Sequence, residues 1–96
     1  AFFEKLPRIV PDGKTLVIEK GSWAVPEIFR KIQKKGRIDE VEMFRTFNMG
    51  LGMVVVMPPQ DFCKAKRIFA LHGIDSWIVG SVNKGSKAKV KIICGF

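Results

Sequence analysis

The chain has 96 residues, which is the length of one domain. Its composition, 47% hydrophobic and 27% charged, is typical of a globular protein, and its longest apolar run, nine residues at 49–57, is far shorter than the roughly 20 that a membrane-spanning helix needs. The net charge of +8 would suit an anionic partner, but the Lys and Arg residues are spread along the chain, so we predict neither nucleic-acid nor membrane binding.

The first part of the chain predicts a loop, a strand and a helix. Pro7 and Pro11 keep the opening segment extended or looped. Residues 15–19 are β-branched and apolar in alternation, which predicts a strand that is buried on at least one side. In the helix that follows, Pro26 suits the first turn and Gly36 suits a left-handed C-cap. The apolar face of this helix has the helical spacing and comprises Val25, Ile28, Phe29 and Ile32.

The middle of the chain predicts a second helix and a buried strand. Asp39, with Glu42 three residues later, is a start that resembles a capping box. We expect the helix to stop near residues 48–50, and its apolar side comprises Val41, Met43, Phe44 and Phe47. Residues 53–57 are apolar without interruption, which predicts a strand buried on both faces.

The last part predicts a third helix and two strands. The helix runs from about Pro59 to Leu71, with a core face of Phe62, Ala65, Ile68 and Phe69. Strands over 76–82 and 87–94 flank a hairpin turn at 83–86. In the last strand the alternation places Ala88, Val90, Ile92 and Cys94 toward the core and Lys87, Lys89 and Lys91 toward water.

These elements predict a single α/β domain over residues 1–96. Their order is strand, helix, helix, strand, helix, strand, strand. Such an order is typical of helices packed on a mixed sheet. No internal repeat or low-complexity segment divides the chain.

The sequence contains no metal-site spacing and no evident catalytic residue. Cys63 and Cys94 lie far apart and the chain has a single histidine, so no zinc site is predicted. Both cysteines are expected to be reduced residues of the core or its margin in an intracellular protein, with a disulfide between them as the alternative. His72 shows no partner for proton transfer and is expected to be a structural or surface residue. The acidic residues at helix starts favour the helix dipole rather than paired catalytic carboxylates.

Residues 44–53 are the most informative stretch, because they place polar side chains and two glycines at the corner between a helix and an apolar run. Arg45 offers a rigid fork that suits phosphate, and Thr46 and Asn48 add a hydroxyl and an amide. Gly50 and Gly52 follow a helix C-terminus, whereas a standard phosphate loop lies at a helix N-terminus. An anion nest and simple close packing therefore both stay open for these glycines. From the residues alone, a solvated arginine and two helix-end caps are the favoured interpretation.

This stretch resembles a signature of the phosphoribosylformylglycinamidine cyclo-ligases, the aminoimidazole ribonucleotide synthetases. Other segments that resemble the family, in the same order, are 6–11, 21–23, 25–29, 57–59 and 77–80. The resemblance covers nearly all of this sequence but only the C-terminal portion of the family's chain. The sequence departs from the family at residues 1–5, where Lys5 stands in place of the usual asparagine.

The resemblance implies a part of an ATP-dependent ligase of purine biosynthesis, which is cytoplasmic. The enzyme closes the imidazole ring of aminoimidazole ribonucleotide from formylglycinamidine ribonucleotide. ATP and magnesium would be bound mainly by an N-terminal lobe that this sequence lacks, and the family is homodimeric mostly through that lobe. The resemblance further implies that the chain alone is inactive, and that the substrate side of the cleft between the lobes is lined by Arg45, Thr46, Asn48, Gly50 and Gly52.

The alternative is a free-standing basic α/β domain with a binding or regulatory role. An RNA-binding module of this kind would expose aromatic side chains on its central strands. Residues 53–57 contain none, and no RNP1-like pattern occurs. A regulatory or interaction domain has no such marker and stays open.

Overall fold

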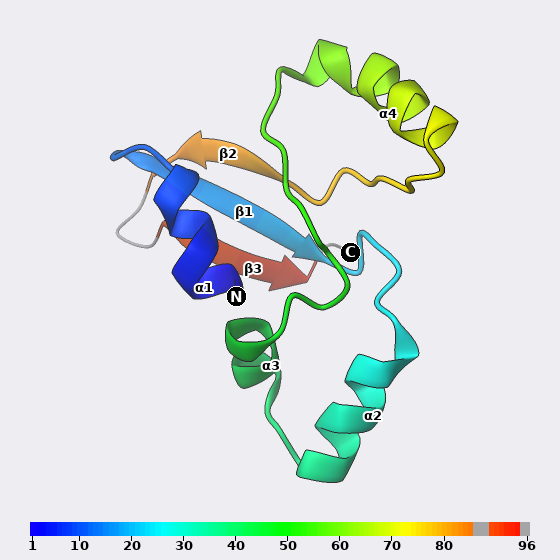
Figure 1. The fold of residues 1–96 in the computed structure, drawn as a ribbon. Coiled ribbons are helices and arrows are strands. Elements are labelled where there is room, and N and C mark those ends of the chain that lie inside the picture. Colours follow the sequence, from blue (N-terminus) through cyan, green and yellow to red (C-terminus); the bar gives the residue numbers. More distant parts are fainter. Residues whose placement is uncertain (86–88, 95–96) are drawn as a thin grey trace.

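The computed structural model describes residues 1–85 and 89–94 and shows three strands with helices packed on them (Figure 1). The predicted α/β class and the mixed sheet are confirmed. The elements, in chain order, are α1 (Phe2–Lys5), the 3₁₀ turn η1 (Leu6–Ile9), β1 (Lys14–Lys20), α2 (Glu27–Gly36), α3 (Glu40–Thr46), the 3₁₀ turn η2 (Pro59–Asp61), α4 (Phe62–Leu71), β2 (Gly80–Lys84) and β3 (Val90–Cys94).

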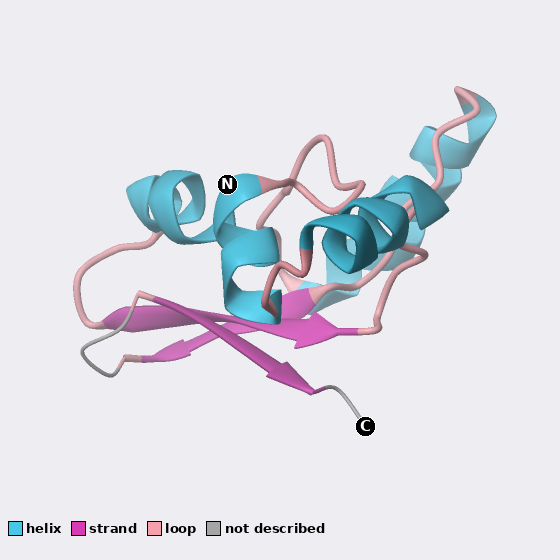
Figure 2. Cartoon of the chain, turned by 90° about the horizontal axis from the view of Figure 1, so that it is seen from below, coloured by secondary structure: helices cyan, strands magenta, loops and turns pink. Residues whose placement is uncertain are grey.

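β1 is the central strand of the sheet, whose order is β2-β1-β3. It pairs antiparallel with β2, where Leu16 faces Val82, and parallel with β3, where Leu16 faces Val90. The side chains of Leu16 and Ile18 are buried, while the intervening Val17 is half-buried, as the alternation predicts. Figure 2 shows the helices on one side of this sheet.

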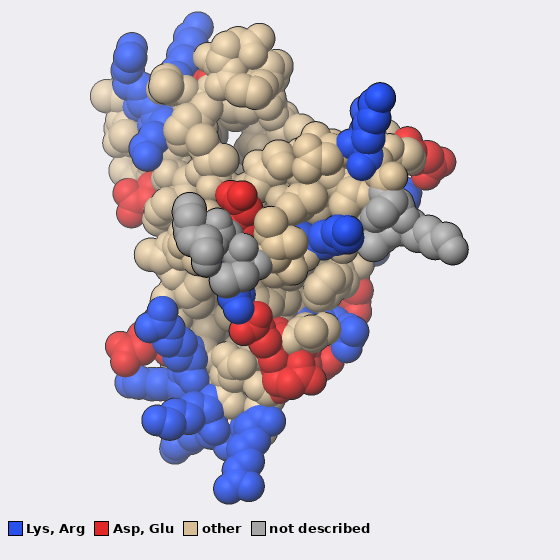
Figure 3. All heavy atoms as spheres, turned by 180° about the vertical axis from the view of Figure 1, so that it is seen from behind, with Lys and Arg blue, Asp and Glu red and all other residues tan. Residues whose placement is uncertain are grey.

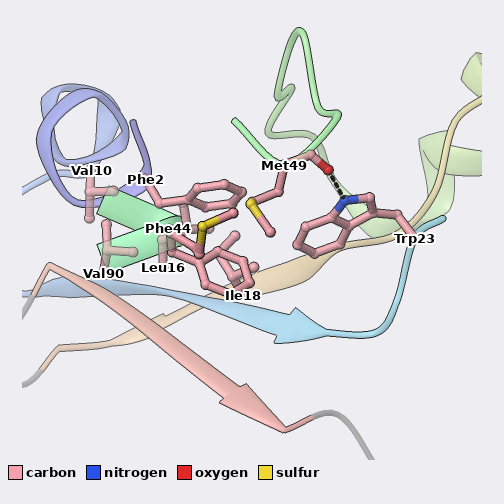
Figure 4. Packing of buried hydrophobic residues seen from close by; sticks show 9 residues of the cluster. Phe2, Val10, Leu16, Ile18, Trp23, Phe44, Met49 and Val90 are labelled. Atoms are coloured by element: carbon pink, nitrogen blue, oxygen red, sulfur yellow. Dashed lines mark hydrogen bonds between the residues drawn. The ribbon is translucent and has the colours of Figure 1, made fainter. Parts of the chain in front are cut away.

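The core lies between the sheet and the helices and is built around three aromatic rings. Phe2 packs edge-to-face on Phe44 with ring centroids 5.2 Å apart, and it stacks on Trp23 at 6.0 Å (Figure 4). Such pairs add about 0.5–1.5 kcal/mol to the stability that area burial provides. The buried apolar residues are Phe2, Val10, Leu16, Ile18, Trp23, Met43, Phe44, Met49 and Val90.

Residues 53–57 are not a buried strand, so this prediction is wrong. The segment forms no strand. It is part of an open connection between the turn that follows α3, at residues 48–50, and η2 (Figure 1). Met53 is 82% exposed and Val55 is 52% exposed. Burial on both faces needs neighbouring strands, and residues 53–57 pair with none of β1, β2 and β3.

The predicted hairpin between the last two strands is also wrong. β2 starts at Gly80 rather than at residue 76, and β1 lies between β2 and β3. β1, whose Leu16 and Ile18 are buried, offers each of the two strands a partner in the core. Within β3, Val90 is buried, Ile92 is half-buried and Lys91 is exposed, which confirms the predicted alternation there. The predictions for Ser86, Lys87, Ala88 and the side chain of Cys94 lie outside the described residues.

Two predicted helix ends can be compared with the structure. Asp39 caps α3, since its Oδ1 accepts a hydrogen bond from the Glu42 backbone N–H at 3.3 Å, which confirms the predicted start. Gly36 is the last residue of α2, and the left-handed position is Arg37, with φ of 50°. The predicted C-cap is therefore wrong by one residue. The side chain of Ile38 lies against Gly36 and would crowd any larger residue there.

The apolar faces of the helices are less covered than predicted. In α2, Ile28 is exposed, and Phe29 is half-buried against Phe47 with ring centroids 5.8 Å apart. In α3, Val41 is exposed, whereas Met43 and Phe44 carry the packing. The predicted third helix is confirmed as η2 and α4, but no residue of α4 is buried and the helix stands away from the sheet in Figure 1.

The buried side of α3 generates a test of this packing. Met43→Ala is expected to lower the free energy of unfolding by about 2–5 kcal/mol, because a fully buried side chain is lost and leaves a cavity. Val41→Ala on the same helix, at a position 54% exposed, is the control and should change it by about 0.5 kcal/mol or less. Urea denaturation followed by circular dichroism measures both. Equal losses would contradict the packing of α3 described above.

Candidate functional site

The corner after α3 is tied to the core by its backbone. Met49 has a left-handed φ of 55°, and its carbonyl oxygen accepts a hydrogen bond from Trp23 Nε1 at 3.0 Å (Figure 4). The donor is a buried indole N–H, which would be costly to leave without an acceptor. The corner is therefore held in one position relative to the aromatic core.

Asn48 and Gly50 close the corner. Asn48 Oδ1 accepts a hydrogen bond from the Gly50 backbone N–H at 2.9 Å, and the Asn48 carbonyl accepts one from the Leu51 N–H at 3.0 Å. Two of the N–H groups that an anion nest would use are thus already donated within the turn. This geometry favours the packing role of Gly50 over the nest.

Gly50 itself is required by its surroundings. Its φ is 98°, and a Cβ at this position would overlap the Pro26 ring that leads into α2. Gly52 lies in open space, with nothing within 4 Å of a Cβ built on it. The two glycines that look alike in the sequence therefore differ, because only Gly50 joins the corner to α2.

Arg45 and Thr46 lie on the outer face of α3 and share one carboxylate. Arg45 Nη1 is 2.7 Å from Glu42 Oε2, and Thr46 Oγ1 donates to Glu42 Oε1 at 3.1 Å. The side chain of Arg45 is 51% exposed. A surface ion pair of this kind is worth about 0–1 kcal/mol, so a stronger anion can compete for the arginine.

A shallow hollow of about 240 Å³ lies between the N-terminus and the corner. Of the predicted site residues, Asn48 and Gly52 line it, whereas Arg45, Thr46 and Gly50 do not. Arg45 is nevertheless close to the hollow, because its backbone carbonyl accepts a hydrogen bond from the α-amino group of Ala1, which is a lining residue. The complete lining is Ala1, Phe2, Lys5, Leu6, Asn48, Leu51, Gly52, Met53 and Val54.

Lys5 is a lining residue that the sequence did not predict as part of a site. It contributes a positive charge at the hollow. The available signal was its occurrence where the resembled family has asparagine, which marked the position without assigning a role. Residues 1–5 and 48–54 meet only through the fold, so no local pattern could connect them.

A second hollow of about 260 Å³ lies between α4 and the segment after it. None of the predicted site residues lines it. Its lining residues are Lys66, Ala70, Ile74, Asp75, Ser76 and Trp77. The buried Ser76 Oγ has no hydrogen-bond partner among the described residues.

The remaining candidates contribute no site. Cys63 is exposed on α4 with a free thiol, so the predicted burial is wrong and the alternative disulfide is not formed. His72 caps the C-terminus of α4 at the surface, as expected. Within residues 1–85 and 89–94, no three His, Cys, Asp or Glu side chains are grouped so as to hold a metal ion. None of the helices in the described part has the length and apolarity to cross a membrane.

Positive charge gathers on α2, where Figure 3 shows a cluster of Lys and Arg side chains. These side chains are exposed. In the described part of the chain, none of them forms an ion pair with a carboxylate. The cluster comprises Arg30, Lys31, Lys34, Lys35 and Arg37. It lies apart from both hollows.

Comparison with known proteins finds one family. Residues 1–93 match the family model described as AIR synthase related protein, C-terminal domain. The chain is 45% identical over 89 residues to the phosphoribosylformylglycinamidine cyclo-ligase of Caldicellulosiruptor bescii, a match that covers 93% of the chain and 26% of that protein. It is 48% identical over 84 residues to the protein of the same name from Caldicellulosiruptor saccharolyticus, covering 88% and 25%. The chain thus spans about a quarter of the length of the curated relatives it matches.

The two corner glycines generate a paired test. Gly50→Ala is expected to lower the free energy of unfolding by about 1–3 kcal/mol, because it strains a left-handed backbone and overlaps the ring of Pro26. Gly52→Ala should change it by about 0.5 kcal/mol or less, because the position is open. Thermal and urea denaturation of both variants measure the difference. Similar stabilities would mean that Gly50 does not hold the corner to α2.

Proposed function

The chain belongs to the AIR synthase related family, as its C-terminal domain, and from that premise we propose that it is one part of a phosphoribosylformylglycinamidine cyclo-ligase. The proposed reaction closes the imidazole ring of aminoimidazole ribonucleotide from formylglycinamidine ribonucleotide at the expense of ATP, within purine biosynthesis. The observation that carries the proposal is the 45% identity over 89 residues, a stretch that covers 93% of the chain. A free-standing binding domain is disfavoured, because the relatives continue well beyond the matched part.

In this proposal the α3 corner contributes to the substrate side of the cleft between two lobes. Asn48 and Gly52 line the hollow beside the N-terminus, and Arg45 and Thr46 stand next to it on the last turn of α3. The ion pair of Arg45 with Glu42 uses Nη1 alone. A guanidinium has five N–H donors, so the side chain retains donors for a phosphate group. Gly50 acts indirectly, by holding the corner in place.

Neither ATP nor magnesium is assigned to this chain. The two carboxylates of α3 are already paired, Glu40 with Lys20 at 2.6 Å and Glu42 with Arg45 at 2.7 Å. A magnesium ion prefers carboxylates and phosphate oxygens without competing cations, so these residues do not fit a metal site. We place both groups in the N-terminal lobe.

The homodimer and the cytoplasmic location complete the proposal, and both rest on the family alone. In the proposed arrangement the dimer forms mostly through the N-terminal lobe.

Replacement of the matched segment in a relative tests the proposed function. A chimera in which this chain replaces the matched 89 residues of the Caldicellulosiruptor bescii protein is expected to close the ring with ATP, because the two segments are 45% identical. Aminoimidazole ribonucleotide formation is measured, with the unmodified relative as the reference. The 96-residue chain alone should show no turnover. A folded chimera without activity, or ring closure by the chain alone, would contradict the proposal.

Arg45→Ala in the same chimera tests the role of the corner. We expect kcat/KM to fall at least tenfold, since a charge-assisted hydrogen bond is worth about 1.5–3 kcal/mol. The melting temperature should hardly change, because Arg45 is half-exposed and makes only a surface ion pair. Arg30→Ala, on the exposed side of α2, is the matched control and should leave the kinetics unchanged. Normal kinetics together with a large fall in melting temperature would make Arg45 a structural residue.

A further inference from the structure

The segment between the α3 corner and η2 has the composition of a strand but no partner strand. Residues 53–57 consist of three valines between two methionines, and β-branched residues favour strands. In the described part of the chain, none of their backbone N–H or C=O groups takes part in a ladder. Unpaired backbone of this kind is a ready template for another strand.

The side chains of the same segment are exposed to an unusual degree. Met53 is 82% exposed, and Val55 and Val56 are both more than half exposed. Soluble monomers rarely leave large apolar surfaces open, and when they do the surface marks an interaction site. Leu71 and Ile78, in and after α4, are exposed as well, so apolar exposure in this chain is not confined to the connection.

The N-terminus lies beside this segment. Ala1 and Phe2 line the same hollow as Met53 and Val54, and the α-amino group of Ala1 donates to the Arg45 carbonyl. In Figure 1 the N-terminus lies beside the connection where it leaves α3. Polypeptide that continues the chain before Ala1 therefore enters next to residue 53. The relatives extend over about four times the matched length, since the match covers 26% of the first.

We propose that the residues immediately before Ala1 in the longer protein form a strand that pairs with residues 53–57. The occupant of the open segment is thus the protein's own preceding chain. This rests on the proposed function only for the existence of that preceding part. At about 3.3 Å per residue, five or six residues are enough to run along the whole segment. The pairing would join the N-terminal part to this domain by backbone hydrogen bonds as well as by apolar contact.

Hydrogen exchange of the backbone amides tests the pairing, with the chimera and the 96-residue chain compared under the same conditions. We expect every second backbone amide among residues 53–57 to exchange at least about 100-fold more slowly in the chimera than in the 96-residue chain. Because successive N–H groups of a strand point to opposite edges, a single new neighbour protects alternate amides. Protection that is equal in the two proteins overturns the proposal. Protection in the isolated chain that grows with its concentration also overturns it, in favour of a second copy.

Two kinds of substitution separate backbone pairing from side-chain packing. Proline at 55 or at 56 removes one N–H, so one of Val55→Pro and Val56→Pro is expected to reduce the protection of the other amides at least tenfold. Val55→Thr and Val56→Thr keep the N–H and the branched shape, and should retain the protection. Loss of protection in the threonine variants but not in the proline variants overturns strand pairing.

The readout is independent of ring closure. An active chimera whose residues 53–57 exchange as fast as in the isolated chain overturns the pairing and leaves the proposed function intact. An inactive chimera with alternate protection supports the pairing and contradicts the proposed function. In the isolated chain, the proline variants should keep the wild-type melting temperature, because the segment makes no ladder there. That measurement shows that the variants fold.

Discussion

The hydrogen bond from Trp23 Nε1 to the Met49 carbonyl is the contact on which the arrangement of the rest depends. Trp23 belongs to the aromatic cluster with Phe2 and Phe44, so this one bond links the N-terminal helix, the segment after β1 and the end of α3. The carbonyl reaches the indole because Met49 adopts a left-handed φ of 55°. Non-glycine residues adopt that conformation at a cost, which a buried and otherwise unpaired indole N–H offsets. The position of the corner is thus set by the core rather than by the loop itself.

In the proposed function, this anchoring orders the corner before a ligand binds. On the side that faces the core, the corner is fixed by the buried Met49 and by Gly50, which lies against Pro26. On the opposite side, Asn48 lines the hollow and Arg45 is exposed to solvent. A ligand that contacts these side chains meets a backbone that is already ordered, so binding costs little conformational entropy there. The polar and apolar sides of the same short segment therefore perform different tasks.

Local sequence signals predicted the individual helices and strands better than they predicted which of these elements pair or pack together. The alternation around Leu16 and the cap at Asp39 depend on residues close in sequence, and both are found in the structure. The hairpin failed because adjacency in sequence says nothing of a third strand that offers a more buried partner, and β1 occupies that place. For the site, the sequence indicated residues 45–52, but not the hollow that brings Asn48 and Gly52 together with Lys5. The hollow forms because α1 packs beside the corner, and the residue spacing within the corner does not predict where α1 packs.

The failure at residues 53–57 has a different physical origin, because the apolar pattern is strong but none of these side chains is fully buried. An apolar run indicates that the segment is stable when it is buried, but it does not show which part of the protein covers it. α4 supports this interpretation: Lys64 and Arg67 lie in water, while Phe62 and Phe69 on the other face are only half-buried. A helix that follows a strand packs back over it and its neighbours. Completing a sheet at 53–57 would give that half-covered face of α4 a surface to rest on. On the pairing proposed above, the exposed connection and the position of α4 away from the sheet have one common cause, the need for the neighbouring strand at residues 53–57.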